Sequence, residues 1–200
     1  MLNNGFSIRQ YRESDLPMLY QICLETGENG GDATGTIDKD LLGHIFAAPY
    51  AYFEPHHCHL LCLGGEVTGY ILGTADSDRF NKSCENLWWP ALREKYPLPE
   101  DVNQSRGANL TRLIHGEIQT PVLLDQYPAH LHIDLLPKAQ GQGLGYQLIR
   151  LFCKGLIDEG VKGVHLGVSK ANTRALSFYL RCGFEVLQDN PEDLIYGMKI

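Results

Sequence analysis

A glycine-rich turn is the clearest chemical feature of the sequence. It runs from Gln140 to Gly145, between an apolar run and a stripe of leucines at helical spacing. Its three glycines let a ligand approach the backbone closely, because no Cβ intervenes. The helix that follows begins with unpaired N–H groups and the positive end of its dipole. The turn therefore predicts a site for a phosphate or a pyrophosphate.

The spacing of this turn excludes two common phosphate loops. The Rossmann pattern G-x-G-x-x-G is not matched from Gly141 onward, and no G-K-[ST] of a Walker loop follows. What the sequence contains is Q-x-x-G-x-G, three residues after Pro137. Such a turn can also serve only to pack a helix on a sheet.

A second motif follows one predicted strand later. It has the pattern N-x-x-A-x-x-F-Y-x-x-x-G-F, running from Asn172 to Phe184. In this order and spacing, the two segments resemble the acetyl-CoA-binding motifs of the GNAT N-acetyltransferase superfamily. The resemblance covers roughly residues 129–187.

A wider resemblance extends over most of the chain. The stretches 26–50, Tyr52–Pro55, Gly69–Thr74 and His130–Asp134 resemble the acetyltransferase-like C-terminal domain of eukaryotic O-GlcNAcase. They resemble stand-alone bacterial relatives of that domain even more. The eukaryotic domain departs from the CoA-binding loop pattern, whereas this sequence keeps it. We therefore expect this chain to bind acetyl-CoA.

The resemblance implies a set of cofactor-binding residues. Main-chain groups of Ile133 and Leu135 are expected to contact pantetheine and the thioester. A backbone N–H near Asp134 or Leu135 is expected to polarise the thioester carbonyl. The expected cofactor-binding residues are Ile133, Leu135, Gln140, Gly141, Gln142, Gly143, Leu144, Gly145, Tyr146, Asn172 and Phe178. Core packing for the apolar members and a helix N-cap for Asn172 are alternative roles.

The expected catalytic residues are Tyr179, Asp134 and His132. Tyr179 matches the position of the family's general acid, and a Tyr with a pKa of about 10 can donate to a departing thiolate whose pKa is about 8.5. An amine acceptor must be neutral to attack, so a base is useful. His130, His132 and Asp134 alternate along one predicted strand and share a face. Asp134 is the first candidate for the base and His132 the second.

Two clusters also suggest metal ligands. The H-x-H-x-D spacing of residues 130–134 suits zinc or iron in a metal-dependent hydrolase. His56, His57, Cys58, His59 and Cys62 form the other cluster. On a strand, its histidines 57 and 59 and its two cysteines face opposite sides, so one ion cannot easily take them all. No metal is expected at either cluster.

The predicted elements indicate an α/β (α+β) fold with a mixed, mainly antiparallel twisted sheet flanked by helices. Strands are predicted at 6–11, 57–63, 67–74, 129–135, 161–168, 184–187 and 194–198. Helices are predicted from Ser14 or Asp15, from Asp38 to Pro49, from Leu144 to Leu156 and from Asn172 to Cys182. One acetyltransferase domain over 1–200 is expected, with an insertion at about 76–128. Glu28, Asp32, Trp88 and Trp89 are candidates for shaping the acceptor pocket; insertion core is the other role for the tryptophans.

Composition excludes several function classes. The net charge of −7 argues against nucleic acid as a partner. Apolar runs are too short to span a bilayer, and the first residues do not read as a signal peptide. Six scattered cysteines predict reduced thiols and a cytoplasmic location. The oligomeric state is left open.

The sequence thus predicts an N-acetyltransferase that transfers acetyl from acetyl-CoA to a primary amine by direct attack. A protein lysine, an amino sugar, a polyamine and an antibiotic amine all fit as the acceptor. A catalytically silent acyl-CoA-binding or protein-interaction module is the alternative.

Overall fold

A computed structural model describes residues 5–100, 102, 105–116 and 125–200. Seven strands form one sheet in the order β1-β2-β3-β4-β5-β7-β6. They are β1 (Phe6–Gln10), β2 (His59–Leu63), β3 (Glu66–Thr74), β4 (Ala129–Leu135), β5 (Gly163–Ser169), β6 (Glu185–Asp189) and β7 (Asp193–Lys199). Only β4 and β5 pair in parallel; every other neighbouring pair in this sheet is antiparallel. The expected mixed, mainly antiparallel sheet is confirmed.

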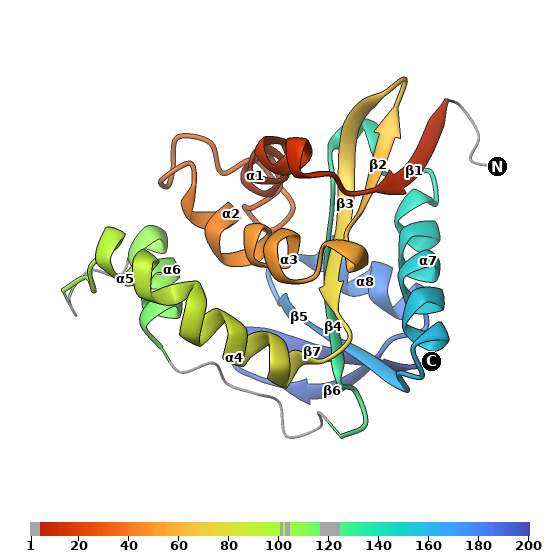
Figure 1. The fold of residues 1–200 in the computed structure, drawn as a ribbon. Helices are drawn as coiled ribbons and strands as arrows, with labels where there is room; N and C mark the ends of the chain where they lie inside the picture. Colours follow the sequence, from red (N-terminus) through yellow and green to blue (C-terminus); the bar gives the residue numbers. More distant parts are fainter. Residues whose placement is uncertain (1–4, 101, 103–104, 117–124) are drawn as a thin grey trace.

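Helices cover both faces of the sheet (Figure 1). They are α1 (Leu16–Glu25), α2 (Leu41–Phe46), α3 (Ala48–Phe53), α4 (Ser77–Leu87), α5 (Trp89–Lys95), α6 (Arg106–His115), α7 (Leu144–Asp158) and α8 (Thr173–Arg181). Three short 3-10 turns are η1 (Glu13–Asp15), η2 (Pro55–His57) and η3 (Pro137–Ala139). In its described part, the segment 76–128 contains α4, α5 and α6. None of the described helices is long and apolar enough to cross a membrane.

Alternation along the central strands divides the core in two. Leu60 and Leu72 point into a cluster formed with α1 to α6, whereas Leu61 and Ile71 point into a cluster formed with α7 and α8. Successive side chains of a strand face opposite sides of a sheet, so two buried faces produce near-continuous apolar runs such as residues 60–63.

Two elements differ from the sequence prediction. The helix expected to end at Pro49 ends at Phe46, and α3 begins at Ala48 with Pro49 in its first turn. Proline fits there because the first turn of a helix does not use its N–H groups. His57 was expected on a strand but lies in η2, and β2 begins at His59.

The strands β4 and β5 separate soon after they meet. Their parallel pairing is restricted to Ala129 with Val164 and His130 with His165. Beyond this point β4 stays paired with β3 as far as Leu135, but its other edge is unpaired. This opening in the sheet positions the candidate site.

Candidate active site

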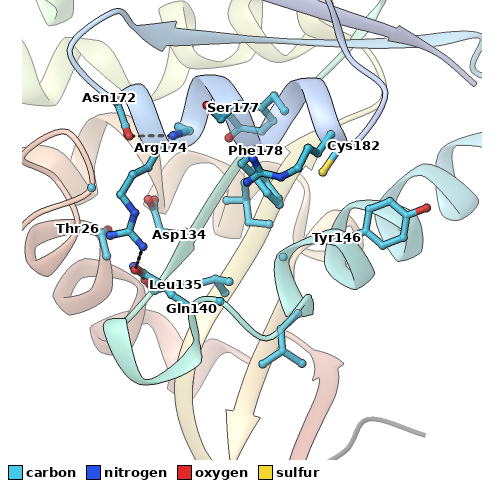
Figure 2. A pocket seen from close by; sticks show the side chains of 18 of the residues that line it. Thr26, Asp134, Leu135, Gln140, Tyr146, Asn172, Arg174, Ser177, Phe178 and Cys182 are labelled. Atoms are coloured by element: carbon cyan, nitrogen blue, oxygen red, sulfur yellow. Dashed lines mark hydrogen bonds between the residues drawn. The ribbon is translucent and has the colours of Figure 1, made fainter.

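A cavity of about 900 Å³ lies where β4 and β5 separate. Its walls come from the end of β4, the glycine-rich turn, the start of α7, the helix α8 and the loop after α1. The volume is in the range of sites for drug-sized and cofactor-sized ligands. Figure 2 shows the side chains that line it.

The free edge of β4 presents main-chain groups to this cavity. Leu136 N–H donates to Thr68 O at 2.9 Å, so the main-chain groups of Leu136 point toward β3. In an antiparallel pair every second residue points its main-chain groups toward the partner strand, so those of Asp134 also face β3. The N–H and C=O groups of Ile133 and Leu135 then point away from β3, toward the opening. Of the two N–H groups considered for the thioester carbonyl, that of Leu135 therefore faces the cavity and that of Asp134 does not.

The glycines of the glycine-rich turn have two distinct structural roles. Gly141 and Gly143 have φ angles of +74° and +73°, which glycine adopts at little cost. A Cβ at Gly145 would instead come within 3.0 Å of Phe178, so this glycine allows α7 to pack closely on α8. Gly143 caps α7 without any side-chain hydrogen bond, which leaves the first N–H groups of the helix directed at the cavity.

The start of α8 forms the opposite wall. Asn172 is the N-cap of this helix, and its Oδ1 accepts from Ala175 N at 3.1 Å. Arg174 reaches across the cavity, and its Nη2 donates to Gln140 Oε1 at 2.7 Å (Figure 2). Gln140 in turn donates to Leu135 O at 2.7 Å. Sequence reasoning did not select Arg174, although its place in the first turn of the helix that follows the second motif was a usable signal.

The structure brings most of the predicted residues together. Those that line the cavity are Asp134, Ile133, Leu135, Gln140, Gly141, Gly143, Leu144, Gly145, Tyr146, Asn172, Phe178 and Tyr179. Gln142 does not line it; its amide donates to Lys138 O at 3.0 Å and supports the turn from outside.

A smaller chamber of about 320 Å³ adjoins the main cavity. The two share Thr26, Ile133, Asp134, Asn172, Ala175 and Tyr179, among others, so they form one continuous cleft. His132 lines only the smaller chamber, together with Phe46 and Arg106. Asp134 and Tyr179 therefore lie at the junction of two compartments.

The carboxylate of Asp134 is buried and anchored. Tyr70 on β3 donates to its Oδ2 at 2.6 Å. Burial raises the pKa of Asp134, while hydrogen bonds from Tyr70 and Thr26 oppose that rise. A raised pKa makes the carboxylate a better proton acceptor.

The phenol of Tyr179 is 8% exposed and faces the same junction. Its ring packs against Phe178 and Phe184, with centroids 5.2 and 5.6 Å away. Burial, and next the negative charge of Asp134, raise the pKa of Tyr179. The hydroxyl is therefore protonated at neutral pH and available as a donor.

The two histidines of β4 have different surroundings. Burial lowers the pKa of His132 to about 4, so its imidazole is neutral. His130 is bonded on both nitrogens, to Tyr50 through Nε2 and to Ser77 through Nδ1, each at 2.6 Å. Among the described residues, His130, His132 and Asp134 do not form a group with ligand atoms close enough for one metal ion. The H-x-H-x-D hydrolase hypothesis thus has no converging ligand set.

The other acceptor-pocket candidates, Glu28, Asp32, Trp88 and Trp89, line neither chamber. Trp88 contacts the rings of Tyr52 and Phe53, and Trp89 is buried in the helical core cluster. Glu28 pairs with Arg106, which lines the smaller chamber. Insertion core is the role that the structure gives the tryptophans.

Comparison with known protein families identifies the family of this chain. The family model described as "Acetyltransferase (GNAT) family" matches residues 19–184. The chain belongs to this family. GNAT proteins use acetyl-CoA, and the cleft of this GNAT domain combines a glycine-rich turn with an open strand edge.

Individual relatives support the assignment. Protein O-GlcNAcase of Rattus norvegicus is 26% identical over 196 residues, which is 95% of this chain and 21% of that protein. This GNAT chain thus spans about a fifth of the length of that curated relative. The crystal structure of SsHAT superposes with a TM-score of 0.91 at 36% identity, covering 98% of both chains.

A more distant GNAT structure shows the same fold. The PaiA N-acetyltransferase of Thermoplasma acidophilum, in complex with coenzyme A, has a TM-score of 0.54 at 14% identity. The alignment covers 98% of this chain and 99% of that one.

Proposed function

We propose that this GNAT protein is an acetyl-CoA-dependent N-acetyltransferase that transfers acetyl to a primary amine by direct attack. The observation that carries the proposal is the position of Asp134 and Tyr179, which both line the two chambers of one cleft. The larger chamber suits the cofactor, because it holds the glycine-rich turn and the start of α7. The smaller one then receives the acceptor.

Each bond change has a group of this chain beside it. The amine nitrogen attacks the thioester carbonyl carbon, whose oxygen is stabilised by the Leu135 N–H at the free edge of β4. The amine proton passes to the Asp134 carboxylate, directly or through water. The C–S bond then breaks, and the sulfur takes a hydrogen bond or a proton from the Tyr179 hydroxyl.

The two catalytic groups are coupled by charge. While Asp134 is ionised, its negative charge helps to raise the pKa of Tyr179. The phenol is then a weak acid. Once Asp134 has taken the amine proton, that charge is gone and the phenol becomes a stronger donor. Proton uptake at one end thereby assists proton delivery to the departing thiolate.

Calorimetric titration with acetyl-CoA is the first test. One-to-one saturable binding is expected, and dephospho- and desulfo-analogues define which parts of the cofactor are recognised. Thiol release is then measured against a lysine peptide, an amino sugar, a polyamine and an aminoglycoside. Turnover with at least one amine class supports the enzyme; absence of binding at millimolar acetyl-CoA overturns the proposal.

Substitution of Asp134 tests its role as the general base directly. Asp134→Asn is expected to lower kcat by about 10²- to 10⁴-fold while acetyl-CoA binding is retained. Asp158→Asn is the matched control, since that carboxylate lies at the far end of α7 in an exposed pair with Lys154. Equal turnover in the Asp134 variant and the wild type removes Asp134 from the mechanism.

A catalytically silent acyl-CoA-binding or protein-interaction module remains the alternative, favoured by the likeness to a fifth of O-GlcNAcase. It predicts tight acetyl-CoA binding without turnover for any amine. We also expect a cytoplasmic location, because all six cysteines are unpaired and five are buried.

A further inference from the structure

A cluster of histidines and carboxylates lies outside the cleft, around the 3-10 turn η2. Glu54, His56 and His57 each place a ligand atom within 4.8 Å of the other two. Glu159, the C-cap of α7, contacts the cluster from outside, with its Oε2 3.4 Å from His57 Nε2, but it does not belong to the group of converging ligand atoms. His56 Nε2 lies 3.5 Å from Glu54 Oε2.

Two atoms in this cluster are buried without a hydrogen-bond partner. The side chains of Glu54 and His57 are 3% and 5% exposed. Glu54 Oε1 accepts from Thr74 and Arg79, but Glu54 Oε2 and His57 Nε2 have no partner. Folded proteins rarely leave buried polar atoms unsatisfied. Among the described residues, His59 Nδ1 and Trp89 Nε1 are also buried without a partner, but Glu54 Oε2 and His57 Nε2 belong to one cluster. Their shared position points to a ligand between them.

Ordinary ion pairs do not explain the cluster. The contact from His57 Nε2 to Glu159 is 3.4 Å and that from His56 Nε2 to Glu54 is 3.5 Å. Both are longer than the 2.7–3.2 Å of a good N–H···O bond.

One spacing in the cluster fits tetrahedral coordination. Zinc binds imidazole nitrogen and carboxylate oxygen at about 2.0–2.2 Å, which separates neighbouring ligand atoms by about 3.3–3.6 Å. His56 Nε2 lies 3.5 Å from Glu54 Oε2. We propose that Glu54, His56 and His57 bind one divalent transition-metal ion, with Zn²⁺ as the best fit and water as the fourth ligand.

The sequence predicts no metal here because it places His57 on a strand. The 3-10 turn instead turns His56 and His57 toward the Glu54 carboxylate. Arg79 and Thr74 hold the other oxygen of that carboxylate, as outer partners of metal ligands commonly do. Arg79 also places a positive charge near the site, and the Glu54 carboxylate offsets it.

The position of the site indicates a structural role. The helix α7 begins at the phosphate-binding turn and has 15 residues, so its C-terminal end lies about 22 Å from the cofactor site. α3 packs on one face of the sheet and α7 on the other. The ion would fix the turn η2 between the end of α3 and the start of β2.

Metal binding to the full chain tests this proposal without any activity assay. The protein is stripped with a chelator, and Zn²⁺ binding is measured by equilibrium dialysis with elemental analysis. One Zn²⁺ per chain is expected, and Zn²⁺ at a hundredfold excess over Kd should raise Tm by roughly 5–10 °C. Co²⁺ in its place should give tetrahedral d–d bands without a thiolate charge-transfer band, which separates this site from the cysteines.

Two variants identify the ligands. His56→Ala alters an exposed side chain, and Glu54→Gln keeps an amide oxygen for Thr74 and Arg79; each should lower Zn²⁺ affinity at least about tenfold. His115→Ala is the control, because that imidazole lies on α6 and bonds to Tyr96 O. Circular dichroism confirms folding. No one-to-one binding to the wild type, unchanged affinity in both variants, or an equal loss in the control overturns the proposal.

Discussion

The hydroxyl of Tyr70 donates a 2.6 Å hydrogen bond to Asp134 Oδ2 from the neighbouring strand. The two residues are directly paired across β3 and β4, and Tyr70 is fully buried. The phenol thus fixes the direction of the carboxylate and moderates the rise in its pKa. Tyr70 is a positioning residue for the candidate base.

Removal of the Tyr70 hydroxyl should shift the pH profile of kcat/KM. Tyr70→Phe deletes a hydrogen bond to the ionised form of Asp134, so the pKa of Asp134 rises further. The acid limb of kcat/KM should move up by about 1 to 2 pH units. Tyr20→Phe, which deletes a hydroxyl bonded to His44, is the matched control. An unshifted profile in the Tyr70 variant contradicts the positioning role.

Loss of the Tyr179 hydroxyl should slow chemistry without weakening cofactor binding. Tyr179→Phe keeps the ring that packs against Phe184 and removes only the donor to the departing sulfur. We expect kcat to fall about 10- to 100-fold and the acetyl-CoA Kd to stay within about twofold. Tyr52→Phe, at an exposed position, controls for a general effect of the substitution. A raised Kd with unchanged kcat would assign Tyr179 to binding instead.

Arg174 should strengthen cofactor binding through the pyrophosphate. Its guanidinium spans the cleft to Gln140 beside the start of α7. Arg174→Ala is expected to weaken acetyl-CoA binding about tenfold, with a smaller difference at high salt. Acetyl-pantetheine, which lacks the pyrophosphate, should bind both forms alike, and Lys154→Ala should bind acetyl-CoA as the wild type does. Equal losses for both ligands contradict a phosphate contact.

Protonation of His132 should destabilise the fold in acid. Its pKa is about 4 in the folded chain and about 6.5 when unfolded, so the unfolded state binds more protons between these values. Stability is therefore lost as pH falls from about 6.5 to about 4, by roughly 3 kcal/mol for this group. Urea unfolding at stepped pH should show a shallower acid loss for His132→Gln than for the wild type. His115→Gln is the control, and parallel pH slopes in all three proteins contradict the prediction.

Much of the fold and the glycine-rich turn of the candidate site follow from local sequence. Alternating or continuous apolar runs predict strands such as 129–135, and the motif Gln140–Gly145 needs positive φ angles that glycine supplies. These signals are short-range, because a turn and the helix that follows it are built from neighbouring residues. The helix boundary at Pro49 was misjudged because proline can start a helix as well as end one.

What only the tertiary structure decided involves residues distant in the chain. Tyr70 lies 64 positions before Asp134, and Arg174 lies 34 positions after Gln140; strand pairing and helix packing bring each pair within hydrogen-bond distance. The same holds for Glu159, which comes within 3.4 Å of His57 from the far end of α7. Local patterns in the sequence identified the groups that can do chemistry. Burial and long-range contacts set their pKa values and their partners, and these depend on the completed fold.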